Sequence, residues 1–153
     1  MIVQVSEKKI IPGALSVWHS PGPEVDIVMD LKAPGFATGS IQRLYVFHFL
    51  ERLLPAQVEP AISVWKRTLA PNAKMFIVND DFEFLARSVL GADLNIGQFN
   101  AEFSHPTYFT RDNLTDHLKA CGFPLEAIAL WFADVTNEFK RQPYELVVSV
   151  DNI

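Results

Sequence analysis

Short apolar runs alternate with longer segments of helical pattern along the whole chain. The short runs are rich in β-branched and aromatic residues, which favour extended strands. The longer segments repeat their apolar residues at spacings of three and four, which favours helices. This alternation predicts an α/β domain. The strands that it predicts cover residues 2–5, 15–18, 26–29, 43–47, 74–78, 128–132 and 144–150.

The clearest helix is expected from residue 56 to residue 69. Pro55 and Pro60 suit the first turns of such a helix, where a missing N–H costs nothing. A short helical turn is expected just before it, near residues 50–54. The apolar residues that form one stripe along the long helix are Val58, Ile62, Trp65 and Leu69.

Two further helices are expected in the second half of the chain. The first follows the Asp80-Asp81 pair, since aspartate is a favoured N-cap residue, and Gly91 is expected to form a left-handed C-cap at its end. The second opens at Thr110, another N-cap type, and stops at Gly122. The sequence thus supplies start and stop signals for both helices.

The last two predicted strands have no helical pattern between them. Only a polar loop with Asn137, Lys140 and Arg141 separates Phe132 from Tyr144. Two strands joined without a crossover helix pair in antiparallel fashion. We therefore expect a long antiparallel hairpin at the end of the chain.

Charge and hydropathy exclude several classes of function. The chain has 18 acidic and 13 basic residues, which give a formal net charge of −5. Basic residues cluster only in pairs, so a nucleic-acid partner is not expected. The N-terminus lacks the apolar run of a signal peptide, and no stretch approaches the ~20 apolar residues that span a bilayer. We expect a cytoplasmic protein without membrane contact.

The length of 153 residues fits one domain, residues 1–153. Hydrophobic residues make up 49% of the chain, so a single core can be large. Cys121 is the only cysteine, which excludes an intrachain disulfide and a thiolate metal cluster. We expect this domain to fold alone or as a homodimer.

Four segments, in order, resemble the class I S-adenosylmethionine (SAM)-dependent methyltransferases, and most closely a small branch often found beside sugar-transfer enzymes. Residues 25–31, VDIVMDL, are similar to a family strand that ends in an acid. Residues 40–53, SIQRLYVFHFLERL, resemble a strand that starts "GS-hydrophobic-D" and ends "H-x-LEH". Residues 65–74, WKRTLAPNAK, are similar to "W-R-V-L-K-P-G-G". The segment from His105 to Phe123 resembles "H…F-T…L…L…A-G-F".

This resemblance implies a Rossmann-like class I methyltransferase fold. The sheet is then mostly parallel, with seven strands and an antiparallel hairpin at the C-terminus. The cofactor SAM is expected outside the carboxyl ends of the strands, where the strand order switches direction. The expected activity is methyl transfer to a small-molecule or sugar-linked acceptor.

The chain departs from the family pattern where the cofactor is expected. The family's first strand ends in a glycine-rich turn, whereas this chain has no glycine before Gly13. The second strand of this chain ends in Trp18 and His19, whereas that of the family ends in a carboxylate that binds the ribose. Further replacements stand at Gln42, Arg52, Asn72 and Ala73. An alternative is therefore a non-catalytic interaction or regulatory protein that does not bind SAM. A third possibility is a domain that kept the pocket and changed its ligand.

Several residues are candidates for the expected site. Asp30 matches a family acid near the adenine, although an Asp there is also typical of a turn or cap. Trp18 at the strand end is expected to stack on a flat ring, or merely to fill the room that a missing nucleotide leaves. The residues expected to bind the cofactor are Val5, Ser6, Trp18, His19, Asp30 and Phe47.

His48 and Glu51 are the candidate catalytic residues. Three residues apart in a helical turn, they lie on one face and suit a general base with an orienting carboxylate. A solvated, self-capped helix start is the alternative. His105 and Tyr108 are expected to line the same site and contact the substrate. No metal is expected, because these residues come from remote segments without a short-range ligand motif.

An acidic cluster precedes the second of the three expected helices. It consists of Asp80, Asp81 and Glu83. Substrate or Mg²⁺ binding is one possible role for it. Because acids just before a helix stabilise its first turn, we expect N-capping instead.

Overall fold

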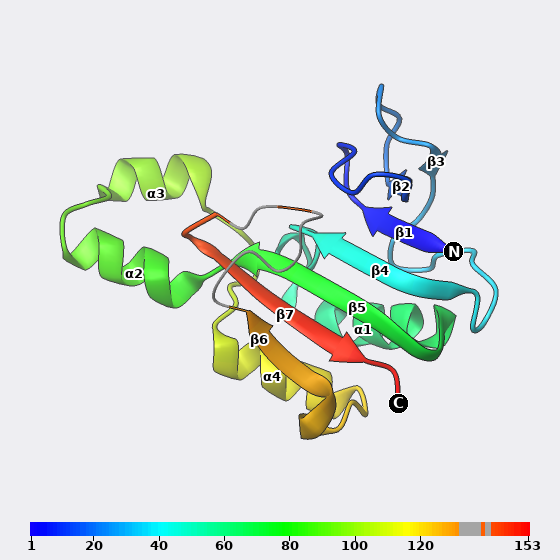
Figure 1. Cartoon of the computed structure of the whole chain (residues 1–153). Helices are drawn as coiled ribbons and strands as arrows, with labels where there is room; N and C mark the ends of the chain where they lie inside the picture. The colour runs from blue at the N-terminus through cyan, green and yellow to red at the C-terminus, as the bar shows by residue number, and fades with distance from the viewer. Residues whose placement is uncertain (132–138, 140–141) are drawn as a thin grey trace.

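The computed structural model describes residues 1–131, 139 and 142–153. These residues form a seven-stranded sheet in the order β3-β2-β1-β4-β5-β7-β6 (Figure 1). Every pairing is parallel except those of β7, which lies antiparallel between β5 and β6. The strands are β1 (Ile2–Val5), β2 (Leu15–Trp18), β3 (Ile27–Val28), β4 (Ile41–Phe47), β5 (Leu69–Asp80), β6 (Ile128–Trp131) and β7 (Glu145–Asp151).

The side chains of the central strands alternate between two buried clusters. On β4, Leu44 and Val46 join the larger cluster, whereas Tyr45 and Phe47 join the smaller one on the opposite face. Tyr45 stacks on Phe76 of β5, with ring centroids 5.0 Å apart. The central strands are therefore buried on both faces, as their near-continuous apolar sequences require.

Two helices cover the face of the larger cluster. They are α1 (Pro55–Thr68) and α4 (Arg111–Ala120), which pack behind the sheet in Figure 1. Val58, Ile62 and Trp65 of α1 are buried, as the apolar stripe predicted. The Trp65 indole also donates a 2.9 Å hydrogen bond to the Leu31 carbonyl, which ties the loop after β3 to the helix.

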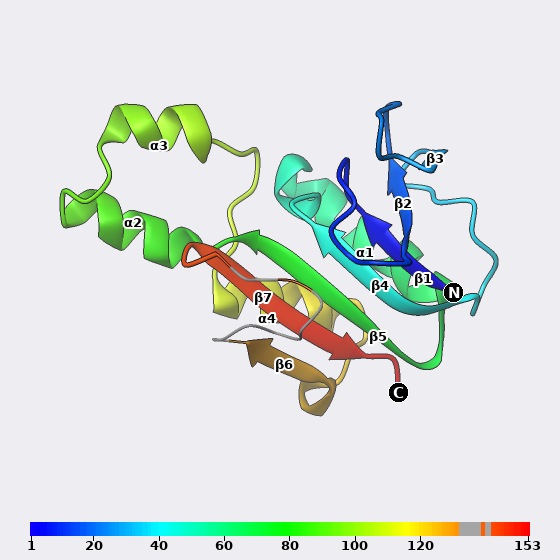
Figure 2. The same cartoon turned by 45° about the horizontal axis from the view of Figure 1, so that its top comes forward.

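A second pair of helices extends beyond the end of the sheet. These are α2 (Phe82–Leu90) and α3 (Ile96–Glu102), which project away from the carboxyl end of β5 in both views (Figures 1 and 2). The sequence interpretation did not include α3, because none of its residues is buried and so no apolar stripe marks it. Its signal was the capping box formed by Asn95 and Gln98.

The strand predictions are confirmed in number and order. β1 and β2 have the predicted bounds, β5 is longer than predicted, and β3 keeps only Ile27–Val28. The antiparallel pairing of β6 with β7 is confirmed, from Ile128 opposite Val150 to Trp131 opposite Val147. Residues 132–138 and 140–141, which include the predicted strand end at 132 and most of the polar loop, lie outside the described residues.

The predicted helix ends are largely confirmed, with one correction. Thr110 caps α4, Gly122 has a φ of +81°, and residues Leu50–Arg52 form the short 3-10 helix η1. The left-handed cap predicted at Gly91 is wrong. Gly91 has a φ of −80°, and the next residue, Ala92, adopts the left-handed conformation with a φ of 62°. The chain therefore reverses one residue later than the glycine indicated.

No helix separates β1 from β2. Residues 6–14 make this parallel crossover as a loop, which is shorter than the dozen or so residues of a usual crossover. Ile11 and Ala14 of the loop pack into the smaller apolar cluster. The fully buried Gln4 side chain holds the loop in place: its amide oxygen accepts from the Ile10 and Ile11 backbones, and its amide nitrogen donates to the Lys8 carbonyl.

Candidate functional site

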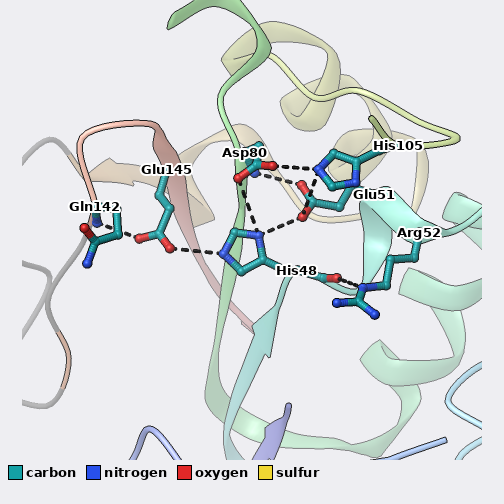
Figure 3. A network of polar contacts seen from close by, with 7 residues as sticks. All are labelled: His48, Glu51, Arg52, Asp80, His105, Gln142 and Glu145. Carbon is teal, nitrogen blue, oxygen red and sulfur yellow. Dashed lines mark hydrogen bonds and ion pairs between the residues drawn. The ribbon is translucent and has the colours of Figure 1, made fainter. Parts of the chain in front are cut away.

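A cluster of polar side chains lies at the carboxyl ends of β4 and β5 (Figure 3). His48 follows β4, Glu51 lies in η1, and Asp80 is the last residue of β5. Glu145 joins them because β7 is antiparallel, so that its first residue lies beside the end of β5. His105 comes from the loop after α3. Five residues from remote segments thus meet at one edge of the sheet.

Short contacts connect these side chains. The Nδ1 atom of His48 lies 2.7 Å from Glu51 Oε1, and its Nε2 atom lies 3.0 Å from Glu145 Oε1. His105 Nε2 lies 2.6 Å from Asp80 Oδ2. Longer contacts of 3.7 Å join His48 Nδ1 to Asp80 Oδ1 and His105 Nε2 to Glu51 Oε1. The two histidines therefore share the same two carboxylates.

The two inner carboxylates are buried, and the backbone fixes one of them. Only 2% of the Glu51 side chain and 7% of that of Asp80 is exposed. The other oxygen of Glu51, Oε2, accepts a 2.8 Å hydrogen bond from the Asp80 backbone N–H. This contact leaves Glu51 Oε1 directed at the histidines. Burial of two carboxylates is costly unless positive charge or hydrogen bonds compensate them.

The carboxylates set the protonation of both imidazoles. Burial by itself lowers the pKa of His48, but its hydrogen bonds to Glu145 and Glu51 and the charges of Glu51 and Asp80 raise that pKa to about 10. The hydrogen bond to Asp80 raises the pKa of His105, against the opposing effect of burial. Without another cation in the cluster, His48 is a charged imidazolium at neutral pH and both of its ring nitrogens are engaged. That state has no lone pair with which to act as a general base.

The cluster contains all the polar residues predicted for catalysis, and two that were not. His48 and Glu51 are paired as expected, and His105 lies beside them. The acidic cluster of Asp80, Asp81 and Glu83 was expected to cap α2, and Asp81 does so: its carboxylate accepts from the Glu83 backbone. Asp80 is the last residue of β5, and its position at a strand end was the sequence signal that could have identified it as a site residue. Glu145 gave no local signal.

Tyr108, expected at the substrate, lies beside the cluster. Its hydroxyl accepts a 3.3 Å hydrogen bond from the His105 backbone N–H. Its ring packs against those of Phe82 and Phe99, with centroids 4.8 and 6.0 Å away. The contacts of Tyr108 therefore hold the His105 loop against α2 and α3.

A hollow lies at the carboxyl ends of β1, β2 and β4, where folds of this topology bind ligands. It consists of two adjoining cavities of about 210 and 390 Å³, both bordered by Glu7, Lys8 and Trp18. The smaller cavity is also lined by Ser6, Phe47, His48 and Arg52, so it reaches the polar cluster. The loop after β1 borders this space without filling it.

The residues predicted to bind a cofactor are distributed unevenly around this hollow. Ser6, Trp18 and Phe47 line the smaller cavity. His19 lies beside the Trp18 ring, with centroids 5.0 Å apart. The side chain of Val5 is fully buried in the larger apolar cluster. Asp30 accepts a 2.9 Å hydrogen bond from the Lys32 backbone, so it has the alternative role of a turn residue.

The loop after β1 offers few free backbone amides to a ligand. Those of four successive residues are bonded within the protein. The acceptors are the Ser6 hydroxyl for Lys8, the Glu24 carboxylate for Lys9, and the Gln4 side chain for Ile10 and Ile11. At the end of β2, Trp18 is buried and the Arg52 guanidinium lies 5.0 Å from its ring centre. The end of β2 itself carries no carboxylate for a ribose, whereas Glu7 and Glu24 border the larger cavity.

Solved structures share this architecture. A SAM-dependent methyltransferase from Archaeoglobus fulgidus superposes with a TM-score of 0.64 at 11% identity, over 91% of this chain and 76% of its own. A SAM-dependent methyltransferase from Thermotoga maritima gives 0.61 at 15% identity, over 90% of this chain and 72% of its own. The chain has the class I methyltransferase fold. No protein-family model and no curated protein matches its sequence.

This methyltransferase fold also occurs in larger chains. The CurJ carbon methyltransferase matches with a TM-score of 0.54 at 13% identity, and this protein spans only 34% of that chain.

Within the described residues, no helix is long and apolar enough to cross a membrane.

Three of the contacts that the family resemblance implies for SAM are replaced or already engaged among the described residues. The amides after β1 are committed, the end of β2 carries an indole instead of a carboxylate, and Asp30 serves a turn. The fold and the hollow of a methyltransferase are present, whereas these three contacts are not.

Proposed function

We propose that this protein is a non-catalytic member of the methyltransferase fold that binds a small ligand other than SAM in its hollow. The committed amides of the loop after β1 carry this proposal. A ligand that used those amides would have to break the hydrogen bonds that Gln4 makes to Ile10 and Ile11. Leaving the buried Gln4 oxygen without a partner costs about 1–3 kcal/mol.

The lining of the hollow supports a change of ligand. Trp18 contributes an aromatic ring to the lining of the smaller cavity, and Lys8 and Arg52 contribute positive charge. Glu7 and Ser6 are further polar groups of that lining. A pocket with an aromatic surface and a few polar groups is typical of small-molecule sites.

A second candidate function is SAM-dependent methyl transfer to a small-molecule or sugar-linked acceptor. The position of the hollow favours it, because the space lies at the carboxyl ends of β1, β2 and β4 and remains open. Its chemistry requires chiefly that the cofactor and the acceptor are held close and in line. In this case side chains, and not a glycine turn, hold the cofactor.

Isothermal titration calorimetry with SAM and with S-adenosylhomocysteine separates the two candidates. We expect no binding heat at millimolar concentrations of either compound. In a separate thermal melt, neither compound should shift the Tm. The Archaeoglobus fulgidus protein, titrated under the same conditions, shows whether the assay detects a cofactor in this fold. Binding of either compound at micromolar strength would overturn the proposal and favour the second candidate.

A further inference from the structure

Four side chains of the polar cluster direct their nitrogen and oxygen atoms at one another (Figure 3). His48, Glu51 and Asp80 each place a potential ligand atom within 4.8 Å of the others. His105 Nε2 lies 2.6 Å from Asp80 and 3.7 Å from Glu51, so it contacts both carboxylates of that group. These four residues are called the His/carboxylate cage below. The four histidine–carboxylate contacts within it range from 2.6 Å to 3.7 Å.

These separations lie on either side of the separation between neighbouring ligands of a small cation. Bonds of about 2.0–2.2 Å from a tetrahedral zinc ion to nitrogen and oxygen place neighbouring ligand atoms roughly 3.4 Å apart. Two of the four contacts, at 3.7 Å, exceed this separation, and two, at 2.6 and 2.7 Å, must widen by several tenths of an ångström. Side-chain rotations of that size leave the strands in place.

We propose that the His/carboxylate cage binds one divalent transition-metal ion, with zinc as the reference ion. Two imidazoles and two carboxylates suit zinc, cobalt or iron, whereas magnesium and calcium prefer oxygen ligands alone. This inference does not rest on the proposed function, because the cage requires neither SAM nor any other ligand in the hollow.

The residues around the cage support the inference independently. Glu145 Oε1 lies 3.0 Å from His48 Nε2, on the side of the ring away from Glu51 and Asp80. A carboxylate that accepts from the outer nitrogen of a metal-binding histidine fixes its tautomer and orients the ring. The Asp80 backbone N–H orients Glu51 in the same manner, through a 2.8 Å hydrogen bond to Oε2.

Charge balance is compatible with a dication. Glu51 and Asp80 bring two negative charges to a place where 2% and 7% of their side chains are exposed. One divalent ion between two neutral imidazoles supplies the same positive charge as two imidazoliums and contacts both carboxylates directly. His48 also lines the smaller cavity, so an ion bound here lies next to the hollow.

Cobalt titration tests the cage directly. The metal-free protein, prepared with EDTA and dialysed, is titrated with Co²⁺ alone while visible absorption reports the coordination geometry. We expect one ion per chain and the intense bands of a four- or five-coordinate site, which Zn²⁺ then displaces. The variants Glu51→Gln and His105→Gln are each expected to weaken binding by at least about tenfold, a loss typical of metal-site substitutions.

A matched control is available on the surface of the protein. His117 Nδ1 lies 3.0 Å from Glu59 Oε1, so this pair reproduces a histidine–carboxylate contact outside the cage. We expect His117→Gln to bind Co²⁺ like the unaltered protein. Circular dichroism and a thermal melt of each variant show whether it folds.

Glu145→Gln supplies a further readout if a cage variant does not fold. We expect it to retain one Co²⁺ per chain, to weaken the affinity, and to shift the visible bands. Absence of Co²⁺ binding by the unaltered protein at millimolar metal would overturn the inference. So would equal binding by His105→Gln and His117→Gln. SAM binding in the calorimetric test, by contrast, leaves the cage untouched.

Discussion

His48 has a backbone φ of 48°, a value that few residues other than glycine adopt. Its N–H donates a 2.8 Å hydrogen bond to the Val78 carbonyl of the neighbouring strand, and its carbonyl accepts from the Arg52 side chain. These contacts hold the residue in a strained conformation, and such strain is most frequent at functional sites. The strain directs the imidazole toward Asp80 and Glu145, where a continued strand would carry it away.

Cys121 gives a prediction at the same scale. Burial raises the pKa of its thiol, and the charge of Glu59 adds to that effect. Because only the thiolate reacts, the rate with a disulfide reagent in the native protein should reach half its maximum at higher pH than in the unfolded chain. Rates measured across a pH series in buffer and in guanidinium chloride check this. Equal half-maximal pH values in the two states would contradict it.

At the scale of elements, the loops after the strands decide the site more than the strands do. The sheet brings the ends of β1, β2, β4 and β5 to one edge, but the loops that follow these strands carry different side chains and hydrogen bonds. The Gln4 side chain bonds the backbone amides of the loop after β1, so that they are engaged within the protein. The turn after β4 instead places His48 and Glu51 together beside the end of β5. At one edge of the sheet, the loop after β1 therefore lacks the free amides expected for a cofactor, whereas the turn after β4 belongs to a fully connected polar cluster.

The start of α2 provides a prediction at this scale. The Asp81 carboxylate accepts from the backbone N–H of Glu83 at 3.1 Å and caps the helix. Asp81→Ala removes that acceptor, and we expect it to lower the free energy of unfolding by about 1 kcal/mol. Asp81→Asn, which keeps an oxygen at the same place, should lose clearly less. Urea denaturation measures both variants, and equal losses would show that the cap is unimportant.

At the scale of the whole molecule, ion binding in the cage is coupled to folding. The four residues of the cage come from three separate segments of the chain, which approach one another only in the native state. An ion that binds the native state alone adds stability that increases with the ion concentration. At about a hundred times the dissociation constant this amounts to about 2.7 kcal/mol.

Differential scanning calorimetry checks this coupling. We expect Zn²⁺ at that excess to raise the Tm by about 5–10 °C for a chain of this size, and EDTA to reverse the increase. Glu51→Gln should show little of the shift, whereas His117→Gln should show all of it. An increase of the same size in Glu51→Gln would place the ion elsewhere.

The sequence by itself determined most of the architecture. The strand bounds of β1 and β2, the apolar stripe of α1, and the cap at Thr110 follow from local periodicity and from hydrogen bonding between neighbours in the chain. The pairing of His48 with Glu51 also follows, since three residues in one turn place both on one face. These features depend on contacts that are short in sequence.

Only the tertiary structure decided the composition of the site. Asp80 and Glu145 reach His48 and Glu51 because β5 and β7 pair in antiparallel register. The family resemblance predicted His105 at the same site, and the folded chain decided that it contacts Asp80. The commitment of the amides after β1 depends likewise on Gln4, which points inward from a strand. Such contacts join residues far apart in the chain, and no local pattern encodes them. The sequence therefore predicted a methyltransferase architecture, while the folded chain determined which polar groups remain free and which are brought together.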